Sequence, residues 1–121
     1  MKSNWTTVGA VLGALAVVTG AFGAHGLKDR LTPEALELWH TAVLYHVLHA
    51  IALVLYGLFD REGHANLAGR SFLGGIVLFS GSIYALALGA PSWVGIVTPF
   101  GGVLFILGWL AFAWRARPGG R

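Results

Sequence analysis

Five histidines give this chain its main opportunities for chemistry, and the chain contains no cysteine. The lack of cysteine excludes disulfides, thiolate metal sites and cysteine nucleophiles. His46 and His49 lie three residues apart in an apolar segment, a spacing that places both on one face of a helix. A neutral imidazole has one donor and one acceptor nitrogen, so it can bond to another helix, hold a ligand or a metal, or act as a base.

Three interpretations of this pair are open. In the first, the imidazoles hydrogen-bond across helices and hold the structure together; the possible partners are Ser80, Ser82, Tyr84, Thr98 and a backbone carbonyl. In the second, they bind a lipid headgroup, a quinone-like carrier, or a metal together with His25. In the third, a histidine is a base whose partner is Ser80, Ser82 or Tyr84.

The metal and catalytic interpretations both lack a carboxylate inside the apolar segments. Only Asp29, Glu34 and Glu37, on an adjoining loop, are close enough in sequence to approach. We therefore predict no metal site, no cofactor and no catalytic residue, and we favour a protein that is not an enzyme. The candidate ligand-binding residues are His25, His46, His49, Ser80, Tyr84 and Thr98.

The segments that must position these side chains have the composition of membrane spans. The chain is 56% hydrophobic and 11% charged, whereas soluble domains carry about 25% charged residues. A transmembrane helix needs about 20 apolar residues, and turn residues at 89–92 divide the longest uncharged run. The sequence predicts an all-α, polytopic membrane protein, a single compact four-helix transmembrane domain over residues 1–121 with short loops. The expected helices are near 5–25, 36–59, 70–89 and 93–114.

The charged residues predict the orientation of these spans. Four spans place both termini on one side, together with six basic residues: Lys2, Arg61, Arg70, Arg115, Arg117 and Arg121. The other side has only Lys28 and Arg30, so the positive-inside rule makes both termini cytoplasmic. Five tryptophans near span ends fit an interfacial belt: Trp5, Trp39, Trp93, Trp109 and Trp114. The few basic residues suit anionic lipid headgroups rather than nucleic acid.

Small residues form seams on three of the expected helices. The seams are Gly9, Gly13, Ala16, Gly20, Gly23 and Ala24; then Gly74, Gly75, Gly81, Ser82, Ala85 and Gly89; and then Thr98, Gly101, Gly102, Phe105 and Gly108. Such seams allow helix backbones to approach closely in a membrane. They predict a tight bundle, and they leave a homo-oligomer possible.

The helix near 36–59 has two different faces. One face is aliphatic and is expected to contact lipid: Val43, Leu44, Val47, Leu48, Ile51, Val54, Leu55 and Leu58. The other is a polar and aromatic stripe expected to point inward: Ala42, Tyr45, His46, His49, Leu53 and Tyr56. His46 and His49 would lie near the bilayer centre, where ionisable residues indicate a functional site by default. His40 is expected at the interface and His64 in a loop, while His25 joins a site only if the first helix unwinds at Gly23 or Gly26, or if its face is buried.

The last helix is interrupted near its start. Pro99 removes a helical donor, so either the helix kinks there or its regular part begins at Pro99. This break and the histidines are expected in the same outer half of the bilayer. A shared polar pocket is the sharper hypothesis, and a kink relieved by Thr98 is its alternative.

Three motifs resemble a known family. They are Gly20-Ala21-Phe22-Gly23-Ala24-His25-Gly26-Leu27; Trp39, Ala42, Tyr45-His46 and His49-Ala50; and Phe79-Ser80-Gly81-Ser82-Ile83-Tyr84 with Thr98-Pro99-Phe100-Gly101-Gly102. They resemble, over nearly the whole chain, domain-of-unknown-function family 423, which is similar to the eukaryotic transmembrane protein 256. The resemblance implies a four-helix protein of the bacterial inner membrane, with no established substrate, cofactor or catalytic residue.

The sequence thus predicts an integral membrane protein whose partners are membrane lipids, and the resemblance implies that this membrane is the bacterial inner membrane. We expect it to bind a lipid or small ligand, or to support a partner, through a polar pocket in the outer half of the bilayer. The alternative is a membrane-embedded enzyme or a small carrier that uses His46 and His49.

Overall fold

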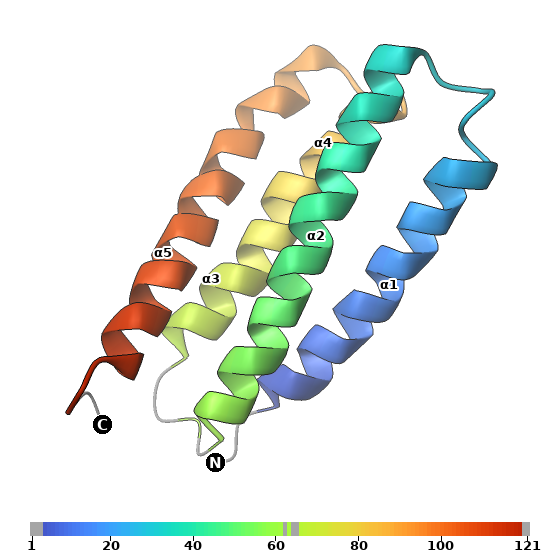
Figure 1. Cartoon of the computed structure of the whole chain (residues 1–121). Helices are drawn as coiled ribbons and strands as arrows, with labels where there is room; N and C mark the ends of the chain where they lie inside the picture. The colour runs from blue at the N-terminus through green and yellow to red at the C-terminus, as the bar shows by residue number, and fades with distance from the viewer. Residues whose placement is uncertain (1–3, 62, 64–65, 120–121) are drawn as a thin grey trace.

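The computed structural model describes residues 4–61, 63 and 66–119, and the regular elements within these ranges are helices. They are α1 (Trp5–His25), α2 (Pro33–Phe59), α3 (Leu67–Gly75), α4 (Gly81–Ala87) and α5 (Thr98–Ala116), with a π-helical segment at Ile76–Ser80 and a 3-10 helix at Ser92–Ile96. Four described stretches are long and apolar enough to span a membrane: Trp5–His25, Pro33–Phe59, Leu67–Ala87 and Ser92–Ala116. The predicted all-α, four-span bundle is confirmed (Figure 1).

The spans depart from the predicted ranges at their ends. Helix α2 begins at Pro33 rather than near 36, because the Thr32 side chain accepts a hydrogen bond from the Ala35 backbone N–H (3.1 Å) and proline suits the first turn of a helix. The third span covers Leu67–Ala87 rather than 70–89. It ends before Gly89, whose positive φ of 103° suits glycine.

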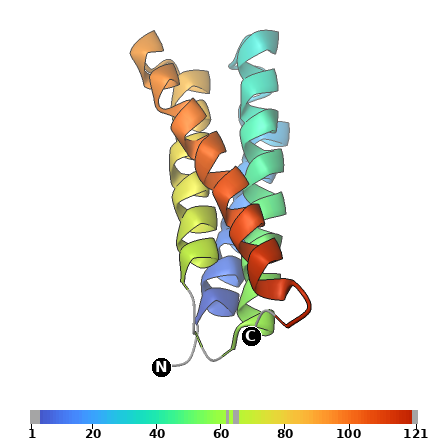
Figure 2. The same cartoon turned by 90° about the vertical axis from the view of Figure 1, so that its left-hand side faces the viewer.

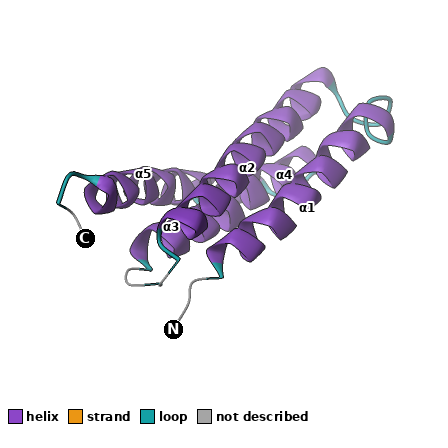
Figure 3. Ribbon diagram, turned by 60° about the horizontal axis from the view of Figure 1, so that its bottom comes forward, coloured by secondary structure: helices purple, strands orange, loops and turns teal. Residues whose placement is uncertain are grey.

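Helix α2 is the central element of the bundle. Helix α1 packs mainly on α2, and α5 packs mainly on α3 and the π-helical segment. Helix α2 contacts α1 on one side and the third span, made of α3, the π-helical segment and α4, on the other. The described chain begins and ends at the same end of the bundle, which we call the terminal end (Figures 1 and 3). Figure 2 shows α5 running obliquely across the bundle, from in front of the third span at the top to in front of the lower part of α2. The larger apolar core therefore lies among α2, α3 and α5, and its centre is formed by Leu53, Tyr56, Phe72 and Phe105.

Glycines from the predicted seams are used for contacts within this one chain. A Cβ on Gly9 would lie 2.7 Å from the Ala50 carbonyl oxygen on α2. A Cβ on Gly101 would overlap the Phe79 backbone, and one on Gly108 would lie 2.7 Å from the Phe72 ring. At Gly9 and Gly101 glycine is required because two helix backbones touch, and at Gly108 because the Phe72 ring packs against the helix backbone.

The π-helical segment and the 3-10 helix break the regularity of the third and fourth spans. The π-helical segment lies between Gly75 and Gly81, weak helix formers, beside the close contact of Phe79 with Gly101. Pro99 lies in the first turn of α5, where its missing N–H needs no partner. Of the two alternatives for Pro99, the one in which a regular helix begins there is correct.

Candidate functional site

The histidine stripe of α2 faces the interior, as its pattern predicts. His46 and His49 are 4% and 5% exposed, whereas Leu44, Leu48 and Ile51 on the aliphatic face are about half exposed. Tyr45 is an exception within the stripe, because 39% of it is exposed. In the 27 residues of α2, His46 is the fourteenth, so it lies at the middle of the span.

His49 has both ring nitrogens occupied. Nδ1 donates to the backbone carbonyl of Tyr45 (2.7 Å), because a carbonyl can only accept. Nε2 therefore carries the lone pair and accepts the hydrogen bond from Trp109 Nε1–H (3.0 Å). The ring also stacks on Phe105 with centroids 3.6 Å apart. These contacts fix one neutral tautomer and join α2 to α5, so the lone pair that a metal or a substrate proton would need is already used.

His46 has one nitrogen occupied. Its Nδ1 shares a hydrogen bond with the Tyr84 hydroxyl of α4 (2.8 Å), and that hydroxyl shares another with Thr19 of α1 (2.9 Å). Thr19 can also donate to the Ala16 carbonyl (3.1 Å). We call Thr19, Tyr84 and His46 the hydroxyl–imidazole chain. It links three helices through side chains that lie between the middle of the spans and the end opposite the terminal end.

The other nitrogen of His46, Nε2, is buried and has no hydrogen-bond partner in the described structure. The His46 ring lies close to the backbone of Leu12 in α1. Two proton arrangements fit the hydroxyl–imidazole chain. In the first, Thr19 donates to the Ala16 carbonyl, the Nδ1–H of His46 donates to the Tyr84 hydroxyl, and Nε2 is an acceptor without a donor. In the second, Thr19 donates to the Tyr84 hydroxyl, that hydroxyl donates to Nδ1 of His46, and Nε2–H is a donor without an acceptor. Leaving either form unsatisfied costs about 1–3 kcal/mol.

The predicted hydroxyl residues are distributed over separate contacts. Ser80 donates to the Ala42 carbonyl of α2 (2.8 Å). Thr98 shares a hydrogen bond with Ser82 (2.5 Å), and Ser82 can also donate to the Phe79 carbonyl. These bonds fasten the third span to α2 and to the start of α5. Thr98 therefore does not join the histidines in the predicted shared pocket. Its hydroxyl bonds to Ser82 of the third span instead of to a histidine.

The structure corrects two further predictions. His25 is exposed at the C-terminal end of α1 and does not join the histidine stripe, because α1 stays helical through that residue. Trp39, predicted for the interfacial belt, is 4% exposed. Its indole N–H donates to the Thr19 carbonyl (2.8 Å) and its ring lies 4.6 Å from the Tyr84 ring. Trp39 thus packs against the hydroxyl–imidazole chain from the side opposite the terminal end. His40 is exposed, as expected, and His64 lies outside the described residues.

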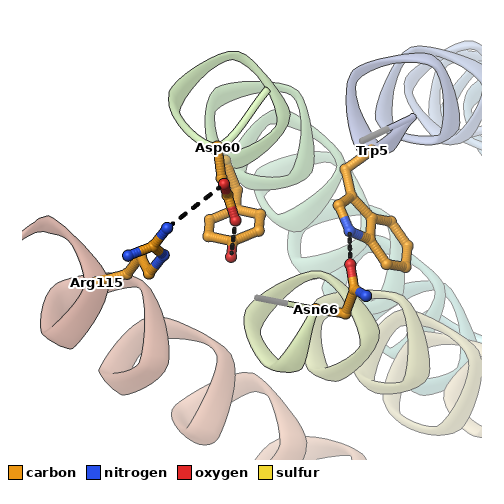
Figure 4. A network of polar contacts seen from close by, with 5 residues as sticks. Trp5, Asp60, Asn66 and Arg115 are labelled. Atoms are coloured by element: carbon orange, nitrogen blue, oxygen red, sulfur yellow. Dashed lines mark hydrogen bonds and ion pairs between the residues drawn. The ribbon is translucent and has the colours of Figure 1, made fainter. Parts of the chain in front are cut away.

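Sequence reasoning missed a polar cluster at the terminal end. Asp60, at the C-terminal end of α2, is 4% exposed and accepts a hydrogen bond from the Tyr56 hydroxyl (2.9 Å). The Arg115 guanidinium of α5 lies 3.8 Å from the other carboxylate oxygen (Figure 4). The Trp5 indole donates to the Asn66 side chain nearby (3.3 Å). The available signal was that Asp60 and Arg115 both directly follow apolar runs that end on the same side.

Comparison with known proteins identifies the family. The model of a family described as "Protein of unknown function (DUF423)" matches residues 19–102. A UPF0382 membrane protein of Staphylococcus epidermidis is 46% identical over 105 residues, covering 85% of this chain and 86% of that protein. The UPF0382 membrane protein YwdK of Bacillus subtilis is 46% identical over 107 residues, covering 85% and 87%. A UPF0382 membrane protein of Haemophilus influenzae is 40% identical over 116 residues, covering 94% of each chain.

No solved structure matches this chain. The matched region contains the hydroxyl–imidazole chain, the π-helical segment and the break before α5. The agreement of the family model, the relatives and the four apolar spans leads to one conclusion. This chain belongs to the DUF423 family of multi-pass membrane proteins.

Proposed function

We propose that this protein is a non-enzymatic membrane protein that binds a lipid or another small lipid-soluble molecule at His46. The observation that carries the proposal is the buried Nε2 of His46, which has no hydrogen-bond partner among the residues that the structure describes. A ligand with a hydroxyl or carbonyl group would satisfy this atom. Because the hydroxyl–imidazole chain has two proton arrangements, Nε2 can present either a lone pair or a proton to that ligand.

The route to this atom lies beside α1. Helix α1 packs mainly on α2, and the backbone of Leu12 in α1 lies close to the His46 ring. A Cβ placed on the next residue, Gly13, would meet no atom within 4 Å, in contrast to the tight fit at Gly9. A small displacement of this turn of α1 would bring a membrane-dissolved molecule to His46. The ligand class is therefore a molecule that partitions into the bilayer and carries one hydrogen-bonding group at its polar end.

An enzyme is not favoured by the contacts of the serines and His49; of the three hydroxyls considered as partners of a basic histidine, only Tyr84 bonds to one, His46. Ser80 donates to a backbone carbonyl, and Ser82 bonds to Phe79 and Thr98, so neither serine hydroxyl is paired with an imidazole. His49 has no free lone pair to act as a base. We further propose that the protein lies in the bacterial inner membrane with both termini cytoplasmic, an orientation supported by the six basic residues on that side.

The test compares His46→Phe with His40→Phe, the same change at an exposed position of the same helix. Both variants and the natural protein are extracted from their native membrane in a mild detergent and examined by native mass spectrometry. We expect a small molecule to remain on the natural protein and on His40→Phe and to be absent from His46→Phe. Retention of the same adduct by a folded His46→Phe variant, or no adduct on any of the three proteins, would contradict the proposal.

A further inference from the structure

A second site lies on the outside of the bundle near the terminal end, away from His46. It is a groove of about 340 Å³ between α3 and α5, with Tyr56 of α2 among its lining residues. We call it the α3–α5 groove and use six of its residues below: Tyr56, Leu67, Leu110, Ala111, Trp114 and Arg115. This volume is in the range of small-molecule sites, about 300–1,000 Å³.

The groove opens toward the lipid. Its rim residues Leu67, Leu110 and Trp114 are 61%, 62% and 67% exposed. In a membrane-spanning bundle such side chains contact acyl chains. The lining is almost wholly apolar, so the part of any occupant that enters the groove must be a hydrocarbon chain.

The polar end of the groove is basic. Arg115 lines the groove, and its guanidinium is within 3.8 Å of Asp60. Arg115 is engaged with Asp60 inside the bundle, so the basic group that faces outward at this end is that of Arg117. The guanidinium of Arg117 lies 3.5 Å from the centre of the Trp114 ring at the rim, and it is exposed. On this side of the spans the sequence has six Lys and Arg residues against two acids, Asp60 and Glu62.

We infer that the α3–α5 groove binds one acyl chain of an anionic phospholipid from the leaflet at the terminal end. The acyl chain lies along Leu110 and Ala111, above the buried Tyr56 ring. The phosphate lies at the exposed guanidinium group of Arg117. Basic pockets between transmembrane helices are known to bind anionic headgroups. This site does not depend on the ligand proposed for His46, because the two share no residue.

The test uses the full chain in detergent with equimolar phosphatidylglycerol and phosphatidylcholine, read by native mass spectrometry. Ala111→Phe fills the groove, and Ala113→Phe adds the same ring to an exposed, lipid-facing position of the same helix. We expect the natural protein and Ala113→Phe to retain one phosphatidylglycerol molecule, and Ala111→Phe to lose it. The opposite result, equal retention by both folded variants, would overturn the inference.

Arg117→Gln provides a second arm that leaves the groove intact. We expect the preference for phosphatidylglycerol over phosphatidylcholine to fall about fivefold, the change that corresponds to about 1 kcal/mol per arginine near a membrane surface. An unchanged preference would contradict the headgroup assignment, also where Ala111→Phe fails to fold. A dimer in place of the lipid adduct in the natural protein would show that a second copy of the chain occupies the groove, and would likewise overturn the inference.

Discussion

At the scale of single residues, His46 and His49 show that two histidines on one helical face can differ in what they offer. The His49 ring is held on both nitrogens and stacked on Phe105, so it acts as a fastener between α2 and α5. The His46 ring is held on Nδ1 alone. Depth in the membrane is common to both residues, and only the contacts separate a structural histidine from a candidate ligand-binding one.

His49→Phe is expected to destabilise the bundle by about 1–3 kcal/mol, because the Trp109 indole N–H then loses its acceptor. Unfolding in mixed micelles with increasing dodecyl sulfate measures this cost. His46→Phe is the matched change on the same face, and it removes one hydrogen bond instead of two. In protein stripped of ligand we expect it to cost less than His49→Phe. Equal costs would contradict the assignment of different roles.

The sequence alone predicted which of these side chains are buried, but not which contacts they make. Periodicity placed His46 and His49 inside the bundle. Tyr84 was among the possible partners in the other spans, and in the structure its hydroxyl bonds to His46. Periodicity could not identify Trp109 as the partner of His49, because that contact depends on how far α5 slides along α2. It could not show that Thr98 bonds to Ser82 for the same reason.

At the scale of the elements, the seam of α1 is used unevenly. A Cβ on Gly9 would lie within 2.7 Å of two backbone atoms of α2, while one on Gly13 would meet nothing within 4 Å. The sequence pattern gives both glycines the same role, whereas the structure gives only Gly9 a packing role.

Gly9→Ala is therefore expected to destabilise the protein by about 1–3 kcal/mol through a clash of α1 with α2. Gly13→Ala is expected to be neutral, or to stabilise by up to about 1 kcal/mol through helix propensity. The same micelle unfolding assay compares the two variants. A cost for Gly13→Ala as large as that for Gly9→Ala would show that α1 is packed evenly against its neighbours.

The π-helical segment at Ile76–Ser80 sets the phase between the two halves of the third span. A π-helical turn contains one residue more than an α-helical turn, so deletion of the exposed Val77 should convert it to α-helix and keep both halves in phase. We expect this variant to fold, whereas deletion of Val103 within α5 should not. Size-exclusion profiles in detergent decide between them, and equal loss of the folded peak would refute the prediction.

At the scale of the whole molecule, composition and run length were sufficient to predict four spans, because a bilayer demands about 20 apolar residues from each helix. The break before α5 could be located from Pro99. The π-helical segment could not be predicted from its residues; it lies where the Phe79 backbone packs against Gly101 of α5, a contact that the sequence does not reveal.

The distribution of basic residues predicts that the terminal end faces the cytoplasm. A C-terminal fusion to green fluorescent protein should fluoresce in a bacterial host, and a fusion to alkaline phosphatase at the same point should be inactive. A phosphatase inserted in the loop after Lys28 is the control and should be active. The reverse pattern would show that the terminal end faces outward.

The central claim is that His46 alone of the two buried histidines takes a bound molecule, and nitrogen NMR of the histidine rings in bilayers tests it directly. The spectrum is recorded on ¹⁵N-histidine-labelled protein as purified in native lipid and again after exhaustive lipid removal and reconstitution. We predict that the His46 Nε2 signal shifts between the two samples, while both His49 signals stay at the positions of an Nδ1–H tautomer with a bonded Nε2. An unmoved His46 signal, or an equal shift of His49, would contradict the account.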